Sequence, residues 1–330
     1  MSNNKKEPSI NDDVLKFASE QYGFDKEKLH YIYSFCNLIY VFPKDKEWYI
    51  LRIGKRPISF VNQIKAELDW MTYLKKNEMK VPAPLYTLQN EKIITIQIED
   101  INYIICVYSA LGDKHWDKNN PELWNKTIFY NWGKMMGDMH RLTKDYKPKN
   151  DIDVREHFNK FTLSDSSIKH IPNIIKIADD LHTEFETYPK DKDSYGLIHA
   201  DFHQWNFLIR DNQINLFDFD DALYGWFAYD IGVALYHALW WGRTNESGYD
   251  FTNDIISNFL KGYFTANQLD DFWLSKIPIF MRYRQICKLS WFLDPDNIDD
   301  HQKERISNIE KGILFTGFEL DETLFIKEKL

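Results

Sequence analysis

The sequence predicts an α+β fold in which a small β-rich N-terminal lobe precedes a larger, mainly helical C-terminal lobe. Strand-like segments and one amphipathic helix fill the first part of the chain, whereas long amphipathic stretches dominate the second part. The pattern changes near residue 110, after Ala110-Leu111-Gly112, without a long linker. We therefore expect an N-terminal lobe over residues 1–110 and a C-terminal lobe over residues 111–330.

The N-terminal elements follow from periodicity and from turn residues. Ile10, Val14 and Phe17 recur at helical spacing, and Gly23 supplies a stop signal. After this helix we expect four strands and one further helix, which runs along a stripe of apolar residues. The strands are predicted over residues 31–42, 47–53, 92–98 and 103–108, and the helix over residues 59–76.

The C-terminal part is predicted to be helical with one interruption. Amphipathic stretches indicate helices over residues 124–142, 171–188, 230–241, 254–264 and 272–292. A compact β-like insertion over residues 196–219 separates the second helix from the third. This insertion also carries the polar residues that suggest a function.

Composition excludes several classes of protein. The formal net charge of −9 disfavours a nucleic-acid partner, because such proteins usually present a basic face. The three cysteines form no CxxC pair, which fits a reducing compartment. No run approaches the ~20 apolar residues that cross a bilayer, and the polar N-terminus resembles no signal peptide. We expect a soluble, cytoplasmic protein without a membrane partner.

The segment that carries chemistry reads H-A-D-F-H-Q-W-N and is followed, after an apolar stretch, by D-F-D. Its first carboxylate is Asp201, in a loop between two apolar segments, and Asn206 follows five residues later. Asp218 and Asp220 come at the end of the next strand, so a hairpin would bring them to the same end. Amide and carboxylate oxygens together suit Mg²⁺. Phosphoryl transfer uses one carboxylate at the attacking hydroxyl and an Asn and an Asp at the metal.

This segment resembles the catalytic-loop and metal-binding signatures of protein kinases, and more closely those of the aminoglycoside phosphotransferase and choline kinase superfamily. The resemblance implies a protein-kinase-like, two-lobed fold and an ATP- and Mg²⁺-dependent phosphotransferase. It makes Asp201 the catalytic base. It also makes Asn206 and Asp218 the Mg²⁺ ligands, with Asp220 in support.

The same resemblance assigns supporting positions. His199 and Asp230 would be structural hydrogen-bonding residues. Arg52 takes the place of the lysine that normally contacts the nucleotide phosphates, and Glu67 lies where a helix glutamate pairs with that cation. Arg can bind phosphate bidentately, but it does not replace a compact ammonium without consequence.

The remaining nucleotide contacts are implied only by the resemblance. Ser34 and Asn37 belong to a glycine-free segment that would cover the nucleotide phosphates. Val107 and Tyr108 begin the stretch to Ala110 that would form the hinge beside ATP.

Three alternatives compete with a small-molecule kinase. His199, Asp201 and His203 alternate and could mark a metal hydrolase, although this leaves Asn206 and the D-F-D acids unexplained. A nucleotide-binding pseudokinase with a regulatory role is suggested by Arg52 and by the glycine-free loop. A protein kinase is disfavoured because Ala200 replaces the Arg of H-R-D and no A-P-E segment follows.

The acceptor is expected to be a hydroxyl group of a small molecule. Acidic residues outnumber basic ones in the C-terminal part, which favours a cationic aminoglycoside or amino-alcohol. Some of the eleven tryptophans, such as Trp205, Trp226, Trp240 and Trp241, could line its pocket, although core packing is the simpler role for each.

Overall fold

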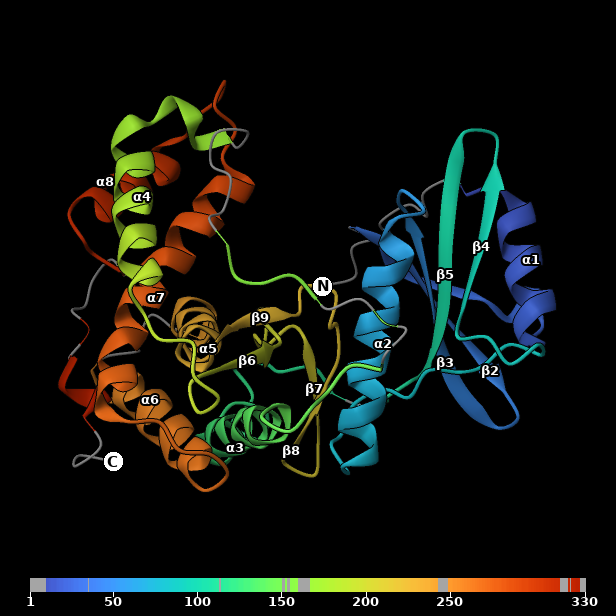
Figure 1. Ribbon diagram of the computed structural model, residues 1–330, viewed down its shortest axis with the longest axis horizontal. Helices are drawn as coiled ribbons and strands as arrows, with labels where there is room; N and C mark the ends of the chain where they lie inside the picture. The colour runs from blue at the N-terminus through green and yellow to red at the C-terminus, as the bar shows by residue number, and fades with distance from the viewer. Residues whose placement is uncertain are drawn as a thin grey trace. The chain divides into compact units, whose positions relative to one another are not determined.

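The computed structural model describes residues 10–34, 36–112, 114–149, 152, 155–159, 167–242, 249–314, 320 and 322–326 (Figure 1). The chain divides into two compact units. Unit 1 comprises Met1–Asp113 and Tyr146–Arg155, and unit 2 comprises Lys114–Asp145 and Glu156–Leu330. The return of the chain to unit 1 after the first helix of unit 2 is not visible in the sequence.

Unit 1 contains a five-stranded antiparallel sheet with the order β1-β2-β3-β5-β4. Its strands are β1 (His30–Ser34), β2 (Asn37–Lys44), β3 (Glu47–Lys55), β4 (Ile93–Ile98) and β5 (Ile101–Ser109). The prediction of one strand over residues 31–42 is wrong, because the chain turns after Ser34 and β2 pairs back on β1. The turn between β2 and β3 places Asp45 and Lys46 at positive φ, as tight hairpin turns require.

Two helices accompany this sheet in unit 1, and both were predicted. In α1 (Asp12–Tyr22), the side chain of Asn11 caps the first turn, and Gly23 ends the helix at a φ of 66°. The second helix is α2 (Phe60–Lys76), and the 3-10 helix η1 (Lys26–Lys28) precedes β1. In Figure 1, α1 lies beside β4 and β5.

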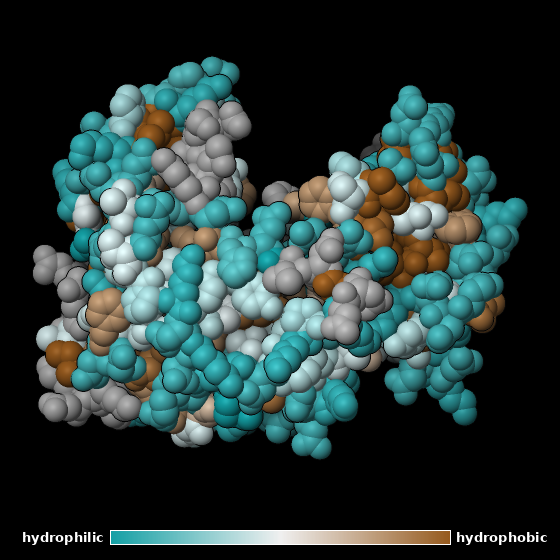
Figure 2. Space-filling model, in the orientation of Figure 1, coloured by the Kyte–Doolittle hydropathy of each residue, from teal (hydrophilic) through white to brown (hydrophobic). Residues whose placement is uncertain are grey.

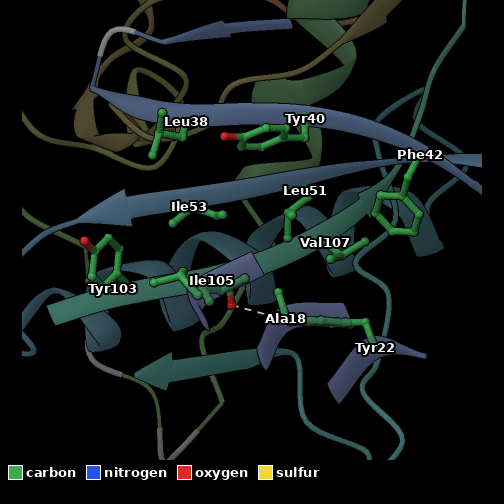
Figure 3. Packing of buried hydrophobic residues seen from close by; sticks show 11 residues of the cluster. Ala18, Tyr22, Leu38, Tyr40, Phe42, Leu51, Ile53, Tyr103, Ile105 and Val107 are labelled. Carbon is green, nitrogen blue, oxygen red and sulfur yellow. Dashed lines mark hydrogen bonds between the residues drawn. The ribbon is translucent and has the colours of Figure 1, made fainter. Parts of the chain in front are cut away.

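The core of unit 1 forms where α1 meets the sheet (Figure 3). Ala18 and Tyr22 of α1 pack against apolar side chains of three strands, among them Leu51, Ile53 and Val107. The Tyr22 hydroxyl donates to the carbonyl of Lys92 at 2.9 Å, so this buried polar group is satisfied. Burial of these rings and aliphatic chains is the main term that stabilises unit 1.

Unit 2 is mainly helical. Its helices are α3 (Lys126–Thr143), α4 (Pro172–Glu186), α5 (Phe227–Gly242), α6 (Tyr249–Phe264), α7 (Asp271–Phe292) and α8 (Asp300–Glu310), with the 3-10 helices η3 (Ser167–His170) and η4 (Glu322–Phe325). The five predicted helices are confirmed, whereas α8 was not predicted. Its start is nevertheless encoded, because Asp299 and Gln302 form a reciprocal capping box.

Helices α3 and α6 approach each other closely because glycines face the contact. A Cβ atom on Gly133 would lie 1.8 Å from the carbonyl oxygen of Phe259. A Cβ atom on Gly262 would lie 1.9 Å from the carbonyl oxygen of Tyr130. Only glycine permits this backbone-to-backbone distance, so the two positions fix how closely the helices pack.

The β-like insertion forms two separate two-stranded ladders. β6 (Tyr195–Ile198) pairs with β9 (Leu223–Trp226), and β7 (Phe207–Arg210) pairs with β8 (Gln213–Leu216). The strands on either side of the catalytic loop, β6 and β7, therefore do not pair with each other. Strand β9 was not predicted. Because β9 pairs with β6, the catalytic loop connects one ladder, formed by β6 and β9, to a second ladder, formed by β7 and β8.

Apolar residues are also found on the surface of unit 1. In Figure 2 hydrophobic residues gather over the region of β4 and β5. None of the helices in the described ranges is long and apolar enough to span a membrane.

Candidate active site

The catalytic loop starts with a backbone conformation that its surroundings hold in place. Ala200 has a φ of 63°, a left-handed value that costs a non-glycine residue roughly 1–2 kcal/mol. The carboxylate of Asp230, from α5, accepts hydrogen bonds from the backbone N–H groups of Ala200 at 2.9 Å and His199 at 3.2 Å. These bonds fix the turn that presents Asp201.

Asp230 is itself part of a buried network of side chains. His140 of α3 lies 3.0 Å from Asp230 through Nε2 and 2.9 Å from the Tyr263 hydroxyl through Nδ1. Asn267 donates to the same hydroxyl at 2.8 Å. Burial lowers the pKa of His140, so a neutral ring that donates through Nε2 and accepts at Nδ1 satisfies both contacts. The network joins three helices beneath the loop.

His199 joins the two segments that carry the candidate site residues. Its Nε2 lies 3.1 Å from the carbonyl oxygen of Phe217, and its Nδ1 accepts from the backbone N–H of Asp201 at 3.3 Å. Burial lowers the pKa of His199, which favours the neutral tautomer that these contacts require. The backbone N–H of Phe217 also donates to the carbonyl of Asn206 at 3.0 Å. The loop and the segment before Asp218 are thus held together as predicted.

Asp201 lies at the centre of the loop with both carboxylate oxygens engaged. The side-chain amide of Asn206 donates to Oδ2 at 3.0 Å, and Nε2 of His203 lies 3.3 Å from the same oxygen. The guanidinium of Arg284, from α7, donates to Oδ1. Burial raises the pKa of Asp201, but His203 and Arg284 hold it well below its usual range. The carboxylate is therefore ionised near neutral pH.

The candidate metal ligands have suitable chemistry. Both side-chain hydrogen bonds of Asn206 use its amide nitrogen, so its oxygen Oδ1 has no protein partner among the described residues. Asp218 is exposed at a φ of 65°, and Asp220 follows it partly buried. In the described part of the chain no three His, Cys, Asp or Glu side chains cluster as metal ligands. One amide and two carboxylates fit a Mg²⁺ ion that takes its other ligands from water and phosphate.

The alternative of a metal hydrolase loses its geometric basis. Strand β6 ends at Ile198, so His199, Asp201 and His203 lie on a loop and not on one face of a strand. His199 is bound within the protein through both ring nitrogens.

In unit 1, Arg52 of β3 and Glu67 of α2 form a buried ion pair. Nη1 and Nη2 donate to the two carboxylate oxygens at 2.8 Å each, and the residues are 7% and 1% exposed. The guanidinium also lies 5.2 Å from the centre of the Tyr108 ring. Burial lowers the pKa of Arg52, but nearby groups, Glu67 included, raise it well above its usual value. The predicted pairing is present, and it fixes α2 against the sheet.

The other predicted nucleotide residues lie in unit 1. Ser34 and Asn37 flank the turn between β1 and β2, and Phe35 lies outside the described residues. The side chain of Val107 is buried in the core, and its carbonyl accepts from the backbone N–H of Leu85 at 2.8 Å. Tyr108 directs its hydroxyl to the thiol of Cys106 at 3.0 Å. Their contacts with a nucleotide stay predictions.

Sequence reasoning missed Arg284 and His237, which lie beside Asp201 in the fold. Both lie at buried positions of helices, where a polar or charged side chain signals a buried partner. Of the tryptophans considered for a pocket, Trp226 is buried in the core at 2% exposure. Trp205 and Trp241 are 48% and 43% exposed.

Sequence comparison places the chain beside known proteins. Residues 37–272 match the family described as "Phosphotransferase enzyme family". The chain is 32% identical over 321 residues to the amicoumacin kinase of Bacillus subtilis (strain 168), and the match covers 93% of this chain and 94% of that protein.

Solved structures extend the similarity to the fold. An amicoumacin kinase in complex with AMP-PNP, Ca²⁺ and Ami superposes with a TM-score of 0.84 at 28% identity, over 98% of this chain and 99% of that one. A microcompartment-associated aminopropanol kinase superposes with a TM-score of 0.71 at 18% identity, over 92% of this chain and 95% of that one. The kinase-like α+β fold is therefore confirmed.

Proposed function

The chain belongs to the phosphotransferase enzyme family, and we propose that it transfers the γ-phosphoryl group of Mg·ATP to a hydroxyl group of a small molecule. The observation that carries this proposal is the direct contact between Asp201 and Asn206 within an anchored loop. An ionised carboxylate beside a free amide oxygen is what an acceptor hydroxyl and a metal-bound phosphate require.

Asp201 orients the acceptor. Its carboxylate accepts a hydrogen bond from the hydroxyl, which directs the oxygen toward the γ-phosphorus. The new bond forms as the bond from that phosphorus to the bridging oxygen breaks, and the electron pair leaves with ADP. Because little covalent chemistry falls to the protein in such reactions, positioning and charge stabilisation supply most of the rate enhancement.

Asn206 and Asp218 would hold Mg²⁺, with Asp220 in support. When bound, the ion neutralises charge on the phosphates. The amide oxygen of Asn206 suits this role because its nitrogen is committed to Asp201. The same amide thus couples the metal side of the site to the carboxylate that meets the hydroxyl.

On the nucleotide side we propose that Arg52 positions the phosphates and that Glu67 holds Arg52 in place. Nη1 and Nη2 of Arg52 each direct one N–H group at Glu67, and we propose that a further N–H group of the guanidinium contacts a phosphate oxygen. Ser34, Asn37, Val107 and Tyr108 complete the proposed nucleotide contacts.

For the acceptor we propose amicoumacin as the first compound to test. The support is the 32% identity to an amicoumacin kinase over 93% of the chain. The expectation of a cationic aminoglycoside or amino-alcohol rests on the excess of acidic residues in the C-terminal part, which describes that part as a whole and not the groups beside Asp201.

An ADP-release assay tests this function directly. Amicoumacin, a panel of aminoglycosides, 1-amino-2-propanol and choline are offered with Mg·ATP. We expect acceptor-dependent ADP release with amicoumacin and phosphorylation detected as a gain of one phosphoryl group in the mass spectrum. Failure with every acceptor, despite tight binding of Mg·ATP in a thermal-shift assay, would favour the pseudokinase alternative.

A further inference from the structure

Arg284 is a buried cation whose contacts converge on Asp201. It lies in α7 at 3% exposure, and its guanidinium donates to Oδ1 of Asp201. Nε donates to Nε2 of His237 at 3.1 Å, and the Cζ atom lies 4.6 Å from the centre of the Trp291 ring. Hydrogen bonds and a ring face thus hold a rigid guanidinium in one orientation.

His237 must be neutral to accept this bond. Since the Nε–H of Arg284 donates, Nε2 of His237 carries no proton, and the ring proton is on Nδ1. Burial, and then Arg284 and His203, lower the pKa of His237 well below its usual value. The ring lies in α5, the helix that also supplies Asp230. Helix α5 therefore supports the loop in two ways. Asp230 binds the loop backbone, and His237 binds Arg284, which in turn contacts the carboxylate of Asp201.

Arg284 and Asn206 donate hydrogen bonds to different carboxylate oxygens of Asp201. Arg284 contacts Oδ1, and Asn206 contacts Oδ2 at 3.0 Å. Two donors on separate oxygens fix both the position and the plane of a carboxylate. Oδ1 receives one donor, from Arg284, and keeps a second lone pair, so the group can still accept a bond from a hydroxyl.

We propose that Arg284 is a positioning residue of the phosphoryl-transfer site: it fixes the orientation of the Asp201 carboxylate, so that this group meets the acceptor hydroxyl as a preorganised hydrogen-bond acceptor. This inference rests on the proposed function of Asp201. The hydroxyl proton then passes to Asp201 only after the bond to phosphorus has formed. A late proton transfer fits a transition state with little bond formation to the attacking oxygen.

Several titratable groups face this carboxylate, and most of them are cations or neutral bases. His199 and His203 come from the loop and its entry, His237 from α5, and Arg284 and Lys288 from α7. Burial, and then Arg284, lower the pKa of Lys288 to about 8. Tyr229 and Asp221 also lie close enough to influence Arg284. Arg284 is the cation that contacts Asp201 from outside the loop.

The test compares Arg284→Met and Arg284→Lys with the control Arg282→Met, which changes an exposed residue of the same helix. For Arg284→Met we expect kcat to fall on the order of 10²-fold with little change in KM for ATP, since positioning acts on the chemical step. Arg284→Lys should recover part of kcat.

A readout independent of activity separates this inference from the proposed function. Crystal structures of the wild type and of Arg284→Met compare the orientation of the Asp201 carboxylate. We expect the wild-type carboxylate to contact Arg284 through Oδ1, and the carboxylate plane to be rotated in Arg284→Met. If Arg284→Met does not fold, Arg284→Lys supplies the comparison.

Two results would overturn the inference. One is an Asp201 carboxylate that keeps its wild-type orientation in Arg284→Met. The other is Arg284→Met with wild-type kcat. If no acceptor is phosphorylated by the wild type, the proposed function fails, and the two crystal structures still decide whether Arg284 orients Asp201.

Discussion

The carboxylate of Asp230 accepts a hydrogen bond from the backbone N–H of Ala200 at 2.9 Å, at a residue whose φ is 63°. The bond holds a left-handed backbone conformation directly before Asp201. Because the loop depends on a distant helix residue for its shape, substitutions at Asp230 should act on catalysis without contacting a substrate.

Asp230→Asn should weaken both the loop and the fold. An amide has one acceptor oxygen, so at least one of the buried donors now bound to Asp230 loses its partner, at about 1–3 kcal/mol each. We expect a lower free energy of unfolding in urea and a lower kcat. Ala200→Gly is the companion variant, since glycine adopts this φ without strain and should preserve kcat. Unchanged stability of Asp230→Asn would show that the network contributes little.

Asp201→Asn should abolish turnover while nucleotide binding persists. Loss of the carboxylate removes the hydrogen-bond acceptor for the hydroxyl, and such groups contribute typically 10²–10⁴-fold to rate. ADP release and calorimetric titration with Mg·ATP measure the two effects. Asp211→Asn, in the exposed turn between β7 and β8, is the matched control. Turnover at the wild-type rate would remove Asp201 from its proposed role.

Glu67→Gln should destabilise unit 1. The substitution leaves Arg52 as a buried cation without its carboxylate, and breaking a buried pair from one side costs about 3–5 kcal/mol. Arg52→Met combined with Glu67→Leu should recover part of this loss, because no buried charge remains. Urea unfolding followed by tryptophan fluorescence gives both values. Additive losses in the double variant would contradict a coupled pair.

Gly133→Ala should force α3 and α6 apart. A methyl group there would lie 1.8 Å from the carbonyl oxygen of Phe259, far inside contact distance. Overpacking of this kind costs typically about 1–3 kcal/mol or more. Lys134→Ala, at the next and exposed position, should leave the melting temperature nearly unchanged. Equal melting temperatures for Gly133→Ala and the wild type would show that the helices can separate freely.

Stability should fall as the pH drops below about 6.5, the ordinary pKa of histidine. Burial lowers the pKa values of His140, His199 and His237 in the folded state, so the unfolded chain binds more protons in this range. Stability therefore rises with pH up to about 6.5 and is lost below it, by at most about 1.4 kcal/mol per pH unit and histidine. Urea unfolding between pH 5.5 and 8 measures the slope. The exposed His301→Asn variant should keep it, and a flat profile would be inconsistent with buried neutral rings.

Local sequence patterns predicted most elements because their signals are local. Helix α1 could be read from apolar spacing and from Gly23, and the loop with Asp201 and Asn206 from the residue types themselves. Strand β9 and the break between β1 and β2 escaped prediction, since short strands are defined by partners far away in the sequence. The site residues within one loop were found, and the resemblance pointed to Glu67 and Asp230. Arg284 and His237, which other helices contribute, were not found.

The residue types and spacing of Asp201, Asn206 and Asp218, together with their resemblance to a phosphotransferase superfamily, indicated phosphoryl transfer from the sequence, because the reaction uses a carboxylate at the attacking hydroxyl and oxygen ligands at the metal. Only the tertiary structure showed that Arg284, 83 residues away, clamps the carboxylate, and that Asp230 holds the backbone before it. The physical reason is that a residue's chemical type is written in the sequence. Its charge partner, its burial and therefore its pKa depend on which distant segments pack around it.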